Sequence, residues 1–294
     1  MTRMSVDLTQ SSSGARLRSR LLPLATAIGR LWERRWRGIR FLCYHSVVRR
    51  EELPDLARLT PAISVDGFRR HLELMRASGH RVVSMDRALA LVASGEADKG
   101  QYICVTFDDG REDNFTNAWP LLREAGHSAH FFVSSGLIGQ AVRARAGGKE
   151  LVDRFMDADM LRTIVREGGS IGSHAHHHVD LTTLDERSLR FELCESRRLL
   201  EAVTGSAIHT HAYPWAVYDR GVLAATREAG FRYAFTAAAG GTVSTLRGRR
   251  ASLTITRNSM RGGNDAEENY VMLRGGMDFS APYSILKMRW TYLR

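Results

Sequence analysis

The stretch ICVTFDDGREDNF, residues 103–115, ends an apolar, β-branched run in two adjacent carboxylates, Asp108 and Asp109. The run is typical of a buried strand. Neighbouring like charges disfavour each other's ionised form unless a positive charge lies close to them. One interpretation is that an aspartate simply caps a helix over residues 113–126. The alternative is that a positive charge, yet to be found, lies beside the pair.

Strand-like and helix-like segments alternate on both sides of this stretch. We expect helices over residues 64–79, 86–95, 113–126, 157–169, 184–205 and 221–230. We expect strands over residues 39–48, 81–85, 102–107, 128–136, 170–173, 209–215, 232–236 and 251–257. Helices that connect short apolar strands predict an α/β fold in which the strands run parallel.

The length of 294 residues suits one α/β barrel domain, which we place at residues 40–260. Residues 261–294 show weak periodicity and are treated as a C-terminal extension. The three cysteines are widely spaced and form no C-x-x-C pair, which argues against a secreted protein built on disulfides. The net charge of +10 favours an anionic partner.

Much of the positive charge lies in the N-terminal segment, residues 1–39. Residues 1–13 are polar and expected to be disordered, whereas residues 14–40 alternate arginine with Leu, Ile and Trp at helical spacing. Such a basic amphipathic helix binds an anionic membrane surface, or else it docks on the protein with its arginines in solvent. No nucleic acid is expected, because no binding module accompanies the charge.

The sequence has no apolar run long enough to span a membrane and no recognisable signal cleavage site. We therefore expect a cytoplasmic protein, or one bound peripherally at the inner membrane face.

Polar residues follow several of the expected strands, where parallel α/β folds gather their chemistry. The segment GSHAHHH, residues 172–178, contains His174 and His178, whose spacing of four lets both rings point the same way on one helical turn. Two imidazoles and one carboxylate form a facial set of ligands for a divalent ion. A bound ion would be the positive charge that Asp108 and Asp109 require. The alternative is a chance cluster of surface histidines.

Two segments together are recognisable: VTFDDGREDNFTNAWPLLREAGHSAHFFV, residues 105–133, and IGSHAHHHVDLTTL, residues 171–184. The chain resembles the polysaccharide deacetylase family (the NodB-homology domain, carbohydrate esterase family four) from about residue 41 to residue 257. The resemblance implies a distorted (β/α) barrel that uses a divalent metal ion, with Zn²⁺ expected, to hydrolyse acetyl groups on carbohydrates. It implies that Asp108 is the general base and that the metal ligands are Asp109, His174 and His178.

The third motif of the family, R-x-P-Y, corresponds to HAYPW. The resemblance implies that the backbone N–H of Tyr213 stabilises the oxyanion, and we expect Pro214 and Trp215 to contact substrate. The arginine position holds Ala212 or His211, a departure that the biofilm-polysaccharide branch of the family tolerates. We place Arg257 with the substrate-binding residues and expect it to replace the missing arginine by orienting Asp108.

The late L-x-L-H motif is missing, because no histidine follows His211. The catalytic acid must then lie elsewhere, and the early YH of the same branch points to His45. We expect removal of N-acetyl groups from an aminosugar polysaccharide or glycolipid. Alternatives are an O-acetyl esterase, a deformylase of a lipid-linked aminosugar, and a carbohydrate-binding barrel without catalysis. The missing motif favours the last alternative, and the intact base and ligand set opposes it.

Overall fold

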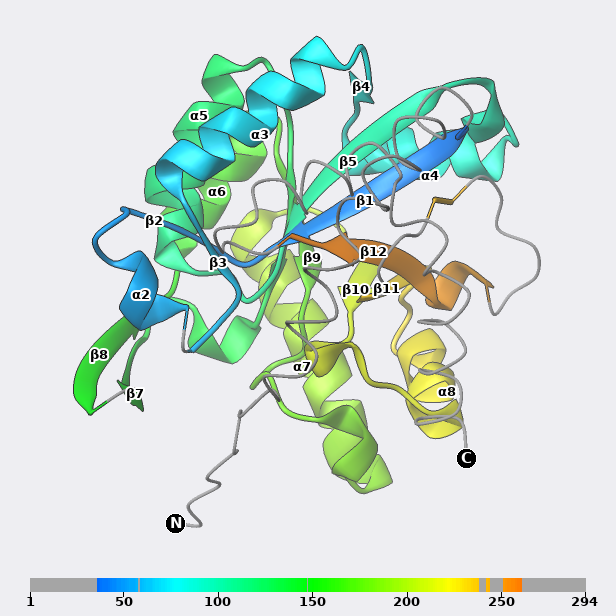
Figure 1. The fold of residues 1–294 in the computed structure, drawn as a ribbon. Coiled ribbons are helices and arrows are strands. Elements are labelled where there is room, and N and C mark those ends of the chain that lie inside the picture. The colour runs from blue at the N-terminus through cyan, green and yellow to red at the C-terminus, as the bar shows by residue number, and fades with distance from the viewer. Residues whose placement is uncertain (1–35, 58, 147, 238–241, 244–250, 261–294) are drawn as a thin grey trace, which may run out of the picture.

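The computed structural model describes residues 36–57, 59–146, 148–237, 242–243 and 251–260 (Figure 1). The expectations for the membrane-binding N-terminal segment and for the C-terminal extension lie almost wholly outside the described residues. None of the helices in the described ranges has the length and apolar content needed to span a bilayer.

Seven parallel strands close into a barrel, which confirms the expected fold (Figure 1). Around the barrel the order is β1 (Gly38–Tyr44), β12 (Ile255–Ser259), β11 (Tyr233–Ala237), β10 (Thr210–Ala212), β9 (Ser170–Ser173), β6 (His130–Val133) and β5 (Gln101–Phe107), which pairs again with β1. Strand β4 (Arg81–Val82) pairs with β5 outside this ring.

The helices begin where the sequence offers a side-chain cap. They are α2 (Leu53–Leu56), α3 (Val65–Ala77), α4 (Met85–Ala93), α5 (Trp119–Glu124), α6 (Ala158–Arg166), α7 (Glu186–Thr204) and α8 (Arg220–Glu228). Ser or Asp side chains accept a backbone N–H at the first turn of five of them: Ser64, Ser84, Asp157, Asp185 and Asp219. These bonds satisfy donors that a helix start otherwise leaves free.

The core has two parts, one on each face of the barrel wall. Inside the barrel, Phe235 contacts Phe41 and Phe132 at ring-centroid distances of 5.2 and 5.3 Å. These residues come from strands that are not neighbours, so the rings meet across the interior. Side chains of α4 belong to the same cluster. The larger cluster lies between the outer face of the strands and the helices.

Two local expectations are wrong, and one element was not expected. The strand expected over residues 39–48 breaks at His45 into β1 and β2 (Ser46–Val48), and β2 pairs with β3 (Ala62–Ser64). The helix expected from residue 113 begins with a π-helical turn, Asn114–Ala118. An unexpected hairpin, β7 (Ala141–Ala146) and β8 (Lys149–Arg154), lies beside α2 (Figure 1). The Gly147-Gly148 pair between its strands was a readable hairpin signal.

Gly172 allows a polar contact inside the barrel wall. His130 of β6 lies 2.7 Å from the Ser170 hydroxyl and 2.9 Å from the Thr210 hydroxyl. A Cβ atom on Gly172 would lie 2.5 Å from both His130 Nε2 and Thr210 Oγ1, and 2.8 Å from a ring carbon of Phe132. The close approach of these side chains therefore requires glycine.

We expect Gly172→Ala to lower the free energy of unfolding by about 1–3 kcal/mol, the usual cost of overpacking a core. Urea unfolding followed by circular dichroism measures the change. The matched control is Gly221→Ala in the first turn of α8, where an added Cβ meets only the Asp219 side chain, at 3.3 Å; its effect should stay within about 1 kcal/mol. Equal stability of the two variants would contradict the packing described here.

Candidate active site

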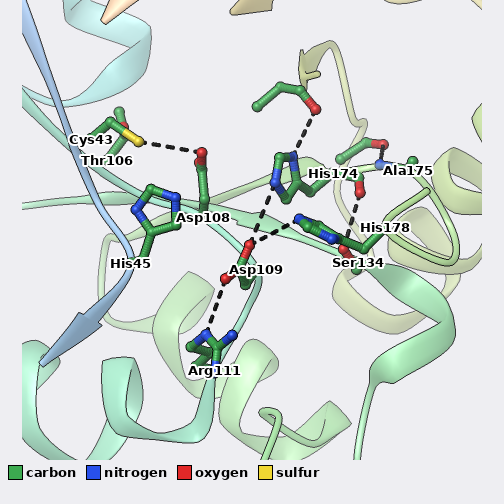
Figure 2. A network of polar contacts seen from close by, with 12 residues as sticks. Cys43, His45, Thr106, Asp108, Asp109, Arg111, Ser134, His174, Ala175 and His178 are labelled. Atoms are coloured by element: carbon green, nitrogen blue, oxygen red, sulfur yellow. Dashed lines mark hydrogen bonds and ion pairs between the residues drawn. The ribbon is translucent and has the colours of Figure 1, made fainter. Parts of the chain in front are cut away.

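The two adjacent carboxylates lie at the carboxyl end of β5 and point in different directions (Figure 2). The N–H of Asp108 donates to the Tyr44 carbonyl at 2.9 Å, which continues the pairing of β5 with β1. Asp109 then adopts a left-handed conformation, with φ of 73°. This conformation costs an L-residue roughly 1–2 kcal/mol. It ends the strand geometry and turns the second carboxylate away from the first.

The positive charge that the sequence required beside Asp108 is Arg257 of β12. Its Nη1 and Nη2 donate to the two oxygens of Asp108 at 2.6 and 2.7 Å. Burial alone would raise the pKa of Asp108, but the guanidinium outweighs burial and holds that pKa well below its usual range. The helix-cap interpretation of Asp108 is wrong, since both of its oxygens are engaged inside the barrel.

Arg257 was expected both to orient Asp108 and to contact substrate. Of these two expected contacts, the structure shows the one with Asp108. The side chain of Arg257 is 1% exposed, and its Nη1 also donates to the Thr106 hydroxyl at 3.2 Å. The guanidinium further lies over the Phe132 ring, 4.9 Å from the centroid. Arg257 is therefore a buried partner of Asp108.

Asp109 faces the histidine segment. Its Oδ1 lies 3.6 Å from His174 Nε2 and 3.2 Å from His178 Nε2, while its Oδ2 accepts from Arg111 Nε at 3.0 Å. One ligand atom from each of Asp109, His174 and His178 lies within 4.8 Å of the others. Burial raises the pKa of Asp109, and hydrogen bonds from the two imidazoles together with Arg111 hold it well below its usual value. The three expected ligands thus converge.

The ligand atoms of Asp109, His174 and His178 fit a divalent ion. Nδ1 of His174 lies 2.8 Å from the Ala212 carbonyl, which can only accept, so Nδ1 carries the hydrogen. Burial lowers the pKa of His174, but the Asp108 and Asp109 carboxylates outweigh burial and raise it, so a proton on Nε2 faces Asp109. In the neutral ring the Nε2 lone pair faces the carboxylate, and a divalent ion can take the place of this proton. A carbonyl behind a ligating imidazole is also the usual second partner of a metal-bound histidine.

The expected helical turn at residues 174–178 is wrong. These residues form an irregular loop after β9, in which Ala175 and His178 have φ of 60° and 57°. The rings of His174 and His178 nevertheless meet, with centroids 4.9 Å apart. His176 and His177 point elsewhere, toward Ser135 and Glu192 respectively. The convergence comes from left-handed residues in the loop, which sequence spacing does not reveal.

His45 lies at the break between β1 and β2, beside the base. One ligand atom each from His45, Cys43 and Asp108 fall within 4.8 Å of one another. Burial lowers the pKa of His45, and the Asp109 and Asp108 carboxylates partly offset that effect. Its Nδ1 is buried without a hydrogen-bond partner among the residues that the structure describes. The ring is thus available for proton transfer next to Asp108.

The third motif places Tyr213 differently from expectation. Its N–H donates to the Phe235 carbonyl at 3.0 Å, and its hydroxyl donates to the Leu253 carbonyl at 3.1 Å. Tyr213 is therefore a packing residue, and its assigned role in oxyanion binding is wrong. Pro214 is buried, whereas Trp215 is 64% exposed and lies 5.1 Å from the His178 ring.

Sequence reasoning missed two neighbours of the carboxylates. Arg111 contacts Asp109 and forms a close ion pair with Asp153 of the β7–β8 hairpin. Cys43 donates its thiol to Asp108 Oδ2 at 3.3 Å, although its apolar context suggested only a small hydrophobe. Arg111 stands two positions after Asp109, and a search for cations near the motif would have found it.

Comparison with known proteins assigns the family. Residues 95–234 match the family model described as polysaccharide deacetylase. The deacetylase PplD of Streptococcus pyogenes and IcaB of Ammonifex degensii superpose with TM-scores of 0.66 and 0.63 at 20% and 21% identity. The superpositions cover 81% and 82% of this chain and 98% of each neighbour. Given the matched motifs and this fold, the chain belongs to the polysaccharide deacetylase family.

Similarity to curated proteins is more distant. The peptidoglycan-N-acetylmuramic acid deacetylase PdaA of Bacillus subtilis is 28% identical over 139 residues, which is 47% of this chain and 47% of PdaA. The chain spans about half the length of the curated Bacillus subtilis relatives that it matches.

We expect Arg257→Ala to lower the free energy of unfolding by about 3–5 kcal/mol at pH 7, because it leaves a buried carboxylate unpaired. Asp108 has a lowered pKa in the folded protein, so the stabilisation by the ion pair is fully present above the unfolded pKa of about 4. It is lost progressively as the pH falls from that value toward the lowered pKa of the folded protein. The difference between the variant and the native chain should therefore shrink on acidification. Urea unfolding at several pH values measures it.

The control is Arg257→Lys, which keeps the charge but loses the paired geometry, and it should be less destabilised than the alanine variant. A difference between the native chain and Arg257→Ala that does not change with pH would contradict the assignment of the pair as the source of the stability.

Proposed function

We propose that this protein is a metal-dependent hydrolase that removes N-acetyl groups from an aminosugar polysaccharide or glycolipid. The observation that carries the proposal is the division of the carboxylate pair: Asp108 is held by Arg257, while Asp109 meets two imidazoles. Asp108 is thus kept ionised and can act as a base, and Asp109 can bind an ion together with the two imidazoles. The family assignment supports the same chemistry.

A divalent ion held by Asp109, His174 and His178, with Zn²⁺ the expected metal, would supply Lewis-acid activation of the acetyl carbonyl and of the attacking water. Asp108 takes the proton of that water. Since Arg257 donates to both Asp108 oxygens, the carboxylate keeps one orientation. The thiol of Cys43 adds a third donor.

His45 delivers a proton to the leaving amine. An unprotonated amide nitrogen is a very poor leaving group, so an acid is needed beside the scissile bond. Burial disfavours the imidazolium form of His45, and the nearby carboxylates favour it. His45 therefore depends on Asp108 and Asp109 to hold a proton transiently.

Trp215, not Tyr213, takes the proposed oxyanion role. In R-x-P-Y the tyrosine follows the proline, and the residue that follows Pro214 is Trp215. Its backbone is left-handed, with φ of 59°, and its ring lies 5.1 Å from the ring of His178, which supports a position of Trp215 next to the ligand loop. Its exposed ring offers an apolar face to a sugar.

The proposed function is tested with N-acetylated, N-formylated and O-acetylated glycans, each assayed with native and metal-stripped protein. We expect metal-dependent release of acetate from N-acetyl substrates. Asp108→Asn keeps the shape but removes the proton acceptor, so turnover should fall about 10²–10⁴-fold with metal content unchanged. Faster hydrolysis of O-acetyl or N-formyl substrates would replace the proposal by an esterase or a deformylase. Glycan binding without hydrolysis would replace it by a binding barrel.

We expect His45→Ala to lose about 10²–10⁴-fold in turnover on an N-acetyl substrate, the usual range for general acid–base catalysis. The loss should be much smaller on an activated aryl acetate, because that leaving group needs no proton. Steady-state kinetics on both substrates, with elemental analysis for metal, make the comparison. An equal loss on amide and aryl ester would show that His45 is structural.

A further inference from the structure

The loop that carries the histidine ligands is held in a costly conformation. Between His174 and His178 the backbone enters the left-handed region at Ala175 and again at His178. Each such residue costs roughly 1–2 kcal/mol relative to a right-handed or extended conformation. Conformations of this kind persist only where the surroundings over-determine them. Something must therefore hold this loop in place.

One side of the loop is held by the 3₁₀ turn η3 (Ser135–Leu137). The N–H of Ser135 donates to the Ala175 carbonyl at 3.3 Å, and the N–H of Gly136 donates to the His176 carbonyl at 2.8 Å. The Ser135 hydroxyl also pairs with His176 Nδ1 at 2.8 Å. These bonds satisfy carbonyls of the loop and leave the N–H groups of His176 and His177 for another partner.

That partner is Glu192 of helix α7. Its Oε2 accepts from the N–H of His176 at 2.9 Å and from the N–H of His177 at 2.8 Å. Its Oε1 lies 2.6 Å from His177 Nδ1. Glu192 is 5% exposed, and a buried carboxylate is tolerated only where donors surround it. All of its observed bonds go to the short segment between the two metal ligands.

We propose that Glu192 is a positioning residue that fixes the histidine loop, so that His174 and His178 face Asp109 before an ion binds. The inference rests on the ligand set of the proposed function. Glu192 does not face the ion, because both of its oxygens are committed to the outer side of the loop. The three bonds between Glu192 and the His176 N–H, the His177 N–H and His177 Nδ1 are called the clamp. Without the clamp the loop relaxes to less costly backbone conformations, and ion binding must then restore the strained conformation. The clamp therefore contributes to affinity through preorganisation.

The test measures Co²⁺ and Zn²⁺ affinity of the full chain by competition with a chromophoric chelator, together with the visible absorption of bound Co²⁺. Glu192→Ala should weaken binding about 10–100-fold, the usual effect of losing a partner behind the ligands. Glu192→Gln should stay within a few-fold of the native chain, because one amide oxygen still accepts both N–H groups. Glu192→Asp keeps the charge but cannot reach them, and it should lose affinity.

Two controls separate the clamp from other effects. Glu195→Ala removes a partly exposed acid of the same helix that pairs with Arg198, and it should bind metal as the native chain does. His177→Ala removes one bond of the clamp but keeps both backbone bonds, so its loss should be small. His178→Ala removes a ligand and should abolish most binding.

The outcomes distinguish the inference from the proposed function. If the native chain binds neither ion, or if His178→Ala binds as well as the native chain, the ligand set itself is wrong. If the native chain binds, and Glu192→Asp and Glu192→Ala bind as tightly as the native chain with an unchanged Co²⁺ spectrum, Glu192 does not position the loop. Equal losses of metal affinity in Glu192→Gln and Glu192→Ala would show that Glu192 acts through its negative charge and not through the hydrogen bonds of the clamp. This result would also overturn the inference. The Asp and Gln variants keep the test decisive if Glu192→Ala does not fold.

Discussion

The buried pair of Asp108 and Arg257 is the interaction on which the rest of the site depends. Two charges taken out of water are tolerated only with good geometry and further hydrogen bonds, and both oxygens of Asp108 meet this demand inside the barrel. The pair joins β5 to β12, which lie on either side of β1. It therefore links the catalytic motif to the last strand of the barrel and keeps one carboxylate away from its neighbour.

That separation gives each carboxylate different partners, which is the basis of the two roles in the proposed function. If Asp108 were free, two adjacent negative charges would compete for one ion, and one of them would tend to take a proton. Because Arg257 satisfies Asp108, the ligand set has a single carboxylate, Asp109, in which Arg111 holds Oδ2 and the imidazoles face Oδ1. The left-handed backbone at Asp109 completes the division, since it turns the Asp109 side chain away from that of Asp108 (Figure 2).

The sequence predicted the features of the fold and of the site that depend on residue type and on the periodicity of apolar residues. The parallel α/β fold followed from apolar strands separated by amphipathic helices, and the family resemblance implied the barrel. The placement of Asp109, His174 and His178 after strands predicted that these side chains converge, which the structure shows. Arg257 was foreseen as the replacement for the arginine that the third motif of the family lacks in this chain. The demand for a counter-charge beside Asp108 had instead suggested a bound ion.

The errors arise where local backbone conformation overrides pattern. The histidine loop was expected to be helical, since spacing alone does not show that Ala175 and His178 are left-handed. His45 stands in an apolar run whose sequence predicts one continuous strand. The structure breaks this strand at His45, whose carbonyl accepts from Asn114 Nδ2 at 2.6 Å. Tyr213 was matched to the motif by residue type, whereas the spacing after Pro214 selects Trp215. Each of these positions depends on a partner distant in sequence.

The two halves of the site thus differ in how they are held. The base half consists of side chains on neighbouring strands, whose positions follow from the closure of the barrel. In the ligand half, His174 is still bonded to the sheet, through the Val133 and Ala212 carbonyls, whereas the strained loop that follows it depends on η3 and Glu192. A change in the barrel wall should therefore affect both halves through stability, whereas a change at Glu192 should weaken ion binding and leave Asp108 and Arg257 in place. The two halves are attached separately, so a change in the histidine loop need not displace Asp108.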